Sequence, residues 1–204
     1  MICRICFVSC HYFGLKALKG ILDSNEFKKG NIDISLLVTL DPIYSQKTVG
    51  YNDFLDLSKA YSIPRIVIKS IKENGIVEKI EKVKPDYILV IGWSQLLPYN
   101  LLDIPQNIHN GNTRHSKSFG CIGMHSTLLP IGRGRAPIPW TIIKGISQTG
   151  VTCFLLEEDA DAGGIILQKD FKLSNKETAT TLYEKCAKFH EILGKELAKI
   201  LSTK

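Results

Sequence analysis

Short apolar runs alternate with amphipathic segments over the first half of the chain. Four runs have the length and the β-branched content of buried strands: residues 2–9, 32–40, 64–68 and 86–92. Three segments between them carry apolar residues at helical spacing: residues 14–22, 51–61 and 71–83. Because parallel strands need crossover connections, this alternation predicts an α/β fold with a Rossmann-like, doubly wound and mostly parallel sheet.

The second half of the chain has a different pattern. A long polar loop is expected over residues 105–123, followed by a short apolar segment around Met124. The later elements are expected to be a helix over 136–144, strands over 150–156 and 164–167, and an amphipathic helix that follows a capping box of Ser174 and Glu177. Neither an internal repeat nor a Pro-, Gly- or Ser-rich linker divides the sequence, so we expect a single domain.

The composition is that of an ordinary globular protein, with 44% apolar and 23% charged residues in a chain of 204. The N-terminal apolar run is too short for a secretory signal, and no run approaches the ~20 apolar residues of a membrane span. We therefore expect a cytoplasmic protein without membrane contact. The net charge of +6 is spread along the chain, which favours small anionic ligands over nucleic acid.

The cysteines and the first loop exclude two common kinds of site. Three of the six cysteines fall in the first predicted strand or directly after it and the other three lie far apart, so neither a zinc pattern nor a disulfide framework is present. We expect reduced structural thiols and no metal site. The segment from Ser9 to Gly14 contains no Gly-x-Gly-x-x-Gly pattern, so dinucleotide binding in the usual manner is not expected.

Two loops at the ends of predicted strands each carry a residue that suits proton transfer. His125 lies in the segment 120–134, and Asp161 lies in the segment 149–163. An imidazole with an ordinary pKa of about 6.5 can take up and return protons near neutral pH, and a carboxylate beside it can orient it and favour its protonated form. The alternatives are that His125 is a surface or structural histidine and that Asp161 ends a turn before Gly163.

Both segments resemble those of the formyltetrahydrofolate-dependent formyltransferases. The pattern of that family runs roughly Asn-x-His-x-Ser-Leu-Leu-Pro-x-x-Arg-Gly, followed by Thr-Gly-Val-Thr and an Asp-x-Gly loop. The matching residues in this chain are His125, Thr127, Leu128, Leu129, Pro130, Arg133, Gly134, Thr149 to Thr152, Asp161 and Gly163. The resemblance implies transfer of a formyl group from N10-formyltetrahydrofolate to an amine. It also implies one catalytic domain over 1–204, with a Rossmann-like half (1–100), catalytic and folate-binding segments (101–173) and a C-terminal helix (174–204).

The resemblance assigns expected roles to individual residues. His125 and Asp161 are expected to be catalytic. The residues expected to bind folate are Gly92, Trp93, Leu97, Thr127, Leu128, Leu129, Pro130 and Asp159. The residues expected to suit an anionic acceptor are His11, Lys16, Lys47, Arg133 and Arg135, of which the two arginines could instead be solvated surface charges. Trp140 is expected only to pack its helix.

One position departs from the family pattern. The family has a catalytic Asn two residues before the histidine, and Gly123 stands there in this chain. Because glycine offers no side chain to hold the formyl oxygen, another donor is expected to serve. The candidates in the preceding polar loop are Asn110, Asn112 and His115, and a backbone group is the alternative.

The resemblance leaves the amine acceptor open. Methionyl-tRNA formyltransferases carry a further basic domain for tRNA, which we do not expect in this protein, so neither tRNA nor other nucleic acid is expected as a partner. Glycinamide ribonucleotide formyltransferase should keep the Asn and a Gly-rich first loop. The stretch 132–140, Gly-Arg-Gly-Arg-Ala-Pro-Ile-Pro-Trp, resembles that of the compact sugar N-formyltransferases. This resemblance implies a nucleotide-linked amino sugar as the acceptor, of the kind that precedes pseudaminic acid or a similar surface glycan, and a possible homodimer. Glycinamide ribonucleotide formylation is the enzymatic alternative, and folate binding without turnover is the other.

Overall fold

A computed structural model describes residues 2–105 and 120–203. Its strands are β1 (Cys3–Val8), β2 (Ile32–Leu40), β3 (Arg65–Ile68), β4 (Tyr87–Val90), β5 (Cys121–His125), β6 (Gln148–Leu155) and β7 (Ile165–Lys172). Its helices are α1 (Tyr12–Leu22), α2 (Asn25–Lys28), the 3-10 helix η1 (Pro42–Lys47), α3 (Leu55–Ala60), α4 (Ile76–Lys82), α5 (Tyr99–Leu102), α7 (Pro137–Ile143) and α8 (Ala179–Leu201).

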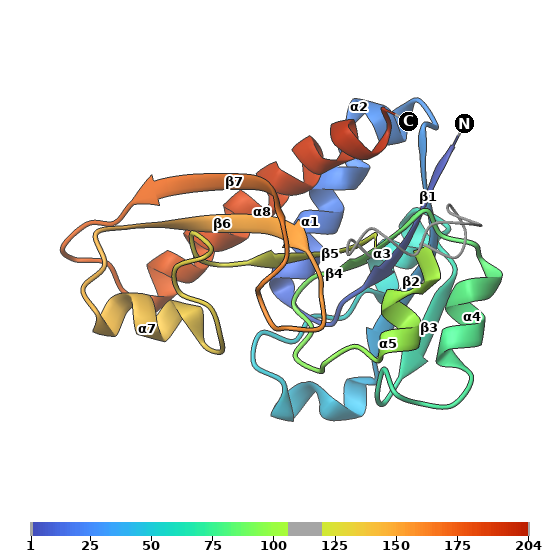
Figure 1. Cartoon of the computed structure of the whole chain (residues 1–204), viewed down its shortest axis with the longest axis horizontal. Coiled ribbons are helices and arrows are strands. Elements are labelled where there is room, and N and C mark those ends of the chain that lie inside the picture. Colours follow the sequence, from blue (N-terminus) through green and yellow to red (C-terminus); the bar gives the residue numbers. More distant parts are fainter. Residues whose placement is uncertain (1, 106–119, 204) are drawn as a thin grey trace.

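The strands form one seven-stranded sheet in the order β3-β2-β1-β4-β5-β6-β7 (Figure 1). The first five strands pair in parallel, and β6 and β7 join as antiparallel strands at one edge. Because the strand order reverses between β1 and β4, the sheet has the switch point at which ligands bind in doubly wound folds. The predicted single-domain α/β fold with a mostly parallel sheet is confirmed.

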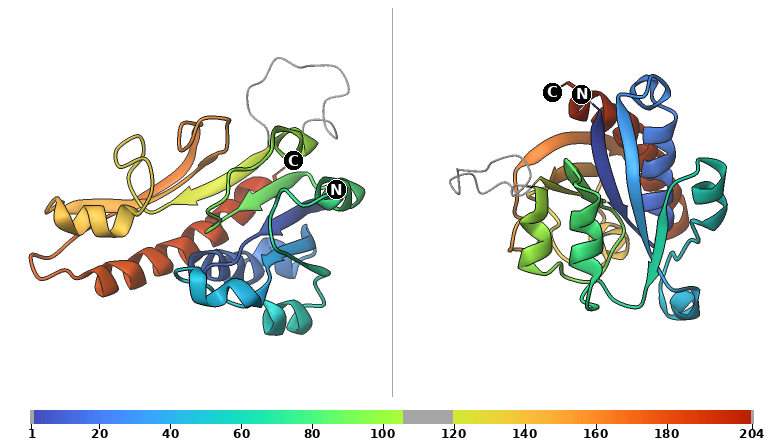
Figure 2. Two further views of the ribbon diagram at one scale, coloured as in Figure 1. Left: turned by 90° about the horizontal axis from the view of Figure 1, so that it is seen from below. Right: turned by 90° about the vertical axis from the view of Figure 1, so that its right-hand side faces the viewer.

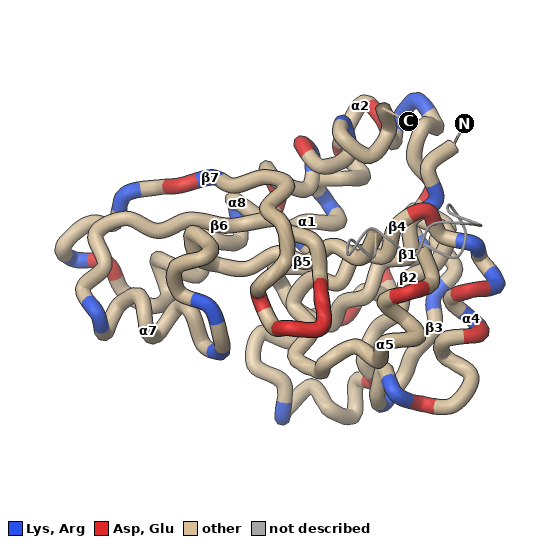
Figure 3. The backbone as a smooth tube through the Cα atoms, in the orientation of Figure 1, with Lys and Arg blue, Asp and Glu red and all other residues tan. Residues whose placement is uncertain are grey.

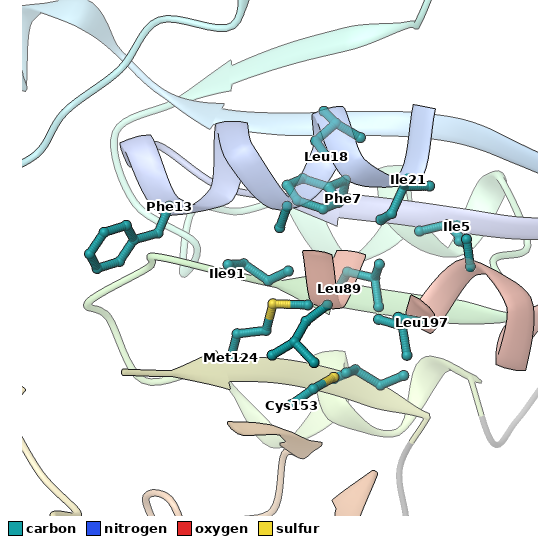
Figure 4. Close-up of a cluster of buried hydrophobic side chains, with 14 of the residues drawn as sticks. Ile5, Phe7, Phe13, Leu18, Ile21, Leu89, Ile91, Met124, Cys153 and Leu197 are labelled. Carbon is teal, nitrogen blue, oxygen red and sulfur yellow. The ribbon is translucent and has the colours of Figure 1, made fainter. Parts of the chain in front are cut away.

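Helices cover both faces of the parallel part of the sheet (Figure 2). On one face α1 and α8 bury a large core, part of which is drawn in Figure 4 and includes Phe7, Leu18, Leu89 and Leu197. On the other face the α4 and α5 segments pack a second core against strands β1, β2 and β4. All six cysteines are buried and reduced, as expected. Within the two ranges that the structure describes, no helix is both long and apolar enough to cross a bilayer.

The helices α1 and α8 approach each other backbone to backbone. A Cβ placed on Gly194 would lie 2.2 Å from the carbonyl oxygen of Ala17, and one on Gly20 would lie 2.0 Å from that of Glu191. Both distances are far below van der Waals contact, so each helix needs glycine where the other crosses it. This close packing holds the long C-terminal helix on the sheet.

Several predicted elements differ from those observed. Helices α3 and α4 are shorter than the predicted segments 51–61 and 71–83, and α4 starts only after Gly75, which has a left-handed φ of 81°. The predicted loop 105–123 runs into a strand, because β5 begins at Cys121 and pairs with β4 and β6. Ser174 and Glu177 do not cap the helix as predicted: Glu177 Oε2 accepts from Ser174 N at 3.3 Å, but Thr178 caps α8 and forms the capping box with Thr181.

Candidate active site

The candidate site lies where strands β1, β4 and β5 end. Their carboxyl ends lead into His11, Gly92 and His125 respectively. A Cβ added to Gly92 would lie 2.5 Å from the Cβ of His11, so the β1 and β4 turns are in direct contact. The sheet thus gathers three predicted site residues at one edge.

The imidazole of His125 is held by the loop that follows its own strand. Its Nε2 lies 2.9 Å from the carbonyl oxygen of Gly132. A carbonyl oxygen can only accept a hydrogen bond, so Nε2 carries the hydrogen in this contact. The neutral ring is therefore the Nε2–H tautomer, and Nδ1 is the nitrogen that can accept a proton.

Asp161 faces that second nitrogen. Its Oδ2 lies 3.9 Å from Nδ1 of His125, and the same oxygen accepts a hydrogen bond from Gly134 N at 2.9 Å. The His125 and Asp161 side chains are only 12% and 19% exposed, so water screens the pair weakly. Asp161 has a left-handed φ of 55° in the acidic β6–β7 connection, whose Asp and Glu residues appear red in Figure 3. The structure thus brings together the two residues expected to be catalytic.

The loop between β5 and α7 contacts both members of this pair. Gly132 O contacts His125, and Gly134 N, two residues later, contacts Asp161. Thr127 Oγ1 also donates to Gly132 O, at 3.3 Å. The backbone of one turn therefore fixes the relative positions of imidazole and carboxylate.

Thr152 and Gln168 hold the base of this loop, and sequence reasoning assigned a role to neither. Thr152 Oγ1 donates to Thr127 O at 2.7 Å and accepts from Leu129 N at 3.1 Å. Gln168 Nε2 donates to Leu129 O at 2.9 Å and to Thr152 Oγ1 at 2.7 Å. Thr152 stood within the Thr-Gly-Val-Thr segment, but no local pattern indicated its partners.

His11 is neutral in this fold. Burial lowers its pKa to about 4, and its Nδ1 accepts a hydrogen bond from Phe13 N at 3.0 Å. It therefore caps α1 and does not supply the positive charge expected of it at neutral pH. Two further amides of this turn are also occupied, because Tyr12 N donates to Gly50 O at 2.8 Å and His11 N donates to Ser9 Oγ at 3.3 Å.

The other expected cations lie in different surroundings. Lys16 of α1 forms an ion pair with Glu191 of α8 at 2.9 Å, so its ammonium group links two helices. Lys47 is exposed at the end of η1. Arg133 and Arg135 are exposed on either side of Gly134, in the turn that contacts Asp161. Neither arginine has an ion-pair partner among the residues that the structure describes. The arginines are thus the expected cations that lie nearest the pair in sequence and remain free for a ligand.

The residues expected to bind folate divide into two groups. Gly92, Trp93 and Leu97 are half-buried after β4, and Leu97 lines a hollow of about 510 Å³ with residues 71–75, 77 and 78. The buried Nε1 of Trp93 has no hydrogen-bond partner in the described part of the chain. Thr127 and Leu129 are buried and bonded to the Thr152 network, so they shape the loop, whereas Leu128 is half-buried and Pro130 and Asp159 are exposed.

A Cβ on Gly123 would lie 2.8 Å from Cδ2 of Leu156, so an apolar side chain occupies the place where the family has its Asn. Asn110, Asn112 and His115 lie outside the described residues. Trp140 was expected to pack its helix, but it is 52% exposed on α7, because that helix turns Ile138 and Thr141 inward instead.

The fold is an α/β fold, and the His125–Asp161 pair forms a candidate site at the carboxyl end of its parallel strands. The sequence model described as "Formyl transferase" matches residues 25–196, and the chain belongs to that family. A methionyl-tRNA formyltransferase from Thermodesulfovibrio yellowstonii is 29% identical over 195 residues, which cover 95% of this chain and 56% of that protein. One from Syntrophus aciditrophicus is 36% identical over 126 residues, which cover 62% of this chain and 36% of that protein. The chain thus spans about half the length, or less, of these curated relatives.

Solved structures agree on the fold. Phosphoribosylglycinamide formyltransferase from Bacillus halodurans superposes with a TM-score of 0.75 at 23% identity, covering 98% of this chain and 96% of that one. A formyltetrahydrofolate deformylase from Pseudomonas syringae superposes with a TM-score of 0.73 at 16% identity, covering 98% and 62%. At these identities the likeness concerns the fold alone.

Proposed function

We propose that this protein transfers a formyl group from N10-formyltetrahydrofolate to the amine of a nucleotide-linked amino sugar. The observation that carries the proposal is the His125–Asp161 pair, with Nδ1 and Oδ2 3.9 Å apart and both side chains tied to one turn. Membership of the formyl transferase family supports the reaction class.

The residues suit the proton movements of this reaction. The neutral amine attacks the formyl carbon, which gives a tetrahedral intermediate with an oxyanion and a protonated nitrogen. Nδ1 of His125 accepts the proton from that nitrogen and returns it to the folate nitrogen as the bond between carbon and that nitrogen breaks. The nearby carboxylate of Asp161 stabilises the imidazolium that forms in between.

The donor is proposed to lie against the segment after β4. Trp93 carries a buried N–H that has no partner in the described residues, and a buried polar group of this kind normally has one. A pterin offers both a flat face and hydrogen-bond acceptors. Leu97 adds apolar surface beside the hollow. The oxyanion donor is proposed to come from Asn110, Asn112 or His115, since Leu156 occupies the place of the family Asn.

The surroundings of the site favour binding of the acceptor's phosphates at the exposed arginines over binding at the N-terminus of α1. Helix N-termini bind phosphate through free amides, but His11 N, Tyr12 N and Phe13 N are all bonded within the protein. Arg133 and Arg135 are exposed and unpaired in the described chain, and guanidinium groups bind phosphates well. We therefore propose that Arg133 and Arg135 bind the anionic part of the acceptor.

The test is formyl transfer from N10-formyltetrahydrofolate to a panel of acceptors. The panel contains nucleotide-linked amino sugars, glycinamide ribonucleotide and charged initiator tRNA, and mass spectrometry detects the formylated product. We expect an amino-sugar product. Formylation of glycinamide ribonucleotide or of the aminoacyl-tRNA instead would refute the acceptor, and donor binding without any product would support the folate-binding alternative.

Variants test the roles within the site. His125→Ala is expected to lower kcat by about 10²–10⁴-fold, because general acid–base catalysis contributes that much. Asp161→Asn should lower kcat as well. Asp170→Asn is a matched control, since Asp170 is an exposed aspartate on β7. Equal activity of His125→Ala and wild type would exclude His125 as the proton carrier.

A further inference from the structure

We infer that Thr152 is a positioning residue, which fixes the tautomer and orientation of His125 through the loop 126–134. Thr152 is fully buried and lies directly opposite His125 in the pairing of β5 with β6. Side chains that face each other across an antiparallel pair point to the same face of the sheet. The hydroxyl of Thr152 is therefore on the side from which the loop folds over His125.

A single oxygen atom makes three hydrogen bonds at the base of the loop. Thr152 Oγ1 donates to Thr127 O, and it accepts from Leu129 N and from Gln168 Nε2, all at 2.7 to 3.1 Å. A hydroxyl has one donor and two acceptor positions, so this group is fully used. It fixes the backbone at two residues just after His125.

The fixed loop then determines which hydrogen-bond partners surround the imidazole of His125. Thr127 Oγ1 donates to Gly132 O, the carbonyl that accepts from Nε2 of His125. Gly134, two residues on, donates to Asp161. Movement of the loop base would shift Gly132 O away from Nε2, and the imidazole would lose the contact that places its hydrogen there. Nδ1 would then no longer be the proton-accepting nitrogen in all molecules.

Thr152→Val tests this inference, because valine keeps the shape and removes the hydroxyl. Nitrogen-15 NMR of the ring, assigned by its loss in His125→Ala, reports the tautomer at a pH where the ring is neutral. We expect the Nε2–H tautomer in wild type and a mixture of tautomers in Thr152→Val. Thr152→Ser keeps the hydroxyl and should restore the wild-type spectrum. Thr149→Val is the control, because Thr149 is a buried threonine on the same strand whose odd spacing from Thr152 puts it on the opposite face.

Kinetics provide the second readout and rest on the proposed formyl transfer. Thr152→Val is expected to lower kcat by about 10–100-fold, with little change in the KM for the formyl donor, because small displacements of a catalytic group cost this much. If wild type formylates none of the acceptors, the NMR result still decides the inference. If Thr152→Val fails to fold, Gln168→Leu decides it, since Gln168 donates to Leu129 O and Thr152 Oγ1 from the exposed side.

The inference is overturned if folded Thr152→Val, or Gln168→Leu in its place, keeps the wild-type tautomer. It is also overturned if Thr149→Val changes the spectrum as much as Thr152→Val does, because the effect would then be general to the strand. A loss of activity with an unchanged ring spectrum would likewise remove the proposed link from Thr152 to His125.

Discussion

Acid is expected to destabilise the protein through His190, a fully buried histidine on α8. Its Nδ1 lies 2.7 Å from Cys186 O, and its ring stacks on Phe13 with centroids 4.5 Å apart. Burial lowers its pKa from 6.5 to about 4. In the unfolded chain the imidazole takes up a proton near its ordinary pKa, so the unfolded state binds more protons than the folded state between these two values. The stability that depends on a neutral His190 is therefore fully present above about pH 6.5 and is lost as the pH falls toward 4.

The shift gives a magnitude for this loss. With the two pKa values 2.5 units apart, linkage predicts that His190 costs about 2 kcal/mol of unfolding free energy between pH 7.5 and pH 5. His190→Asn removes the titration and keeps an amide that can reach Cys186 O. Urea unfolding followed by tryptophan fluorescence gives the free energy of both proteins at both pH values. The difference between wild type and variant should shrink by about 2 kcal/mol on acidification, while the contributions of His11 and of the carboxylates cancel. An equal difference at pH 7.5 and pH 5 would show that the buried ring keeps an ordinary pKa, and the reasoning would fail.

Two further substitutions test the packing that supports the site. Gly194→Ala would place a methyl group 2.2 Å from Ala17 O, so we expect the free energy of unfolding, measured with heat or urea, to fall by about 1–3 kcal/mol. Lys195→Ala, at an exposed position of the same helix, should change it by less than about 0.5 kcal/mol. Unchanged stability of Gly194→Ala would mean that the two helices can separate freely. Gly123→Asn alone should displace Leu156 and reduce stability, and the double variant with Leu156→Ala should recover it, as measured by the same unfolding assay; additive losses would contradict the contact.

The apolar runs of the sequence predicted the strands of the first half of the chain correctly. Strands β1, β2, β3 and β4 fall within the predicted runs. The inner strands β1, β2 and β4 are apolar over most of their length because helices cover both faces of the sheet there, whereas β3 is a partly exposed edge strand. The helices were less certain at their starts. Periodicity could not show that Gly75 adopts a left-handed φ and delays α4, nor that Thr178 rather than Ser174 caps α8. Boundaries depend on backbone geometry, which several nearby residues can supply.

Strand β5 shows a different limit. Its five residues are too short for an alternating pattern and follow a polar loop, so they read as part of it. They become a strand because β4 and β6 on either side satisfy their backbone hydrogen bonds. Pairing between distant segments, and not local preference, decides the structure there.

The amino-acid sequence by itself determined the α/β class and pointed to His125 and Asp161, because the residue types in their two segments suit proton transfer and match a family pattern. Only the tertiary structure decided which nitrogen of His125 carries its hydrogen, that His11 is neutral, and that Leu156 occupies the space beside Gly123. Each of these depends on a carbonyl, on burial or on a side chain supplied by another part of the fold. Hydrogen bonds and desolvation act over a few ångströms in space, and spacing along the chain does not encode such distances.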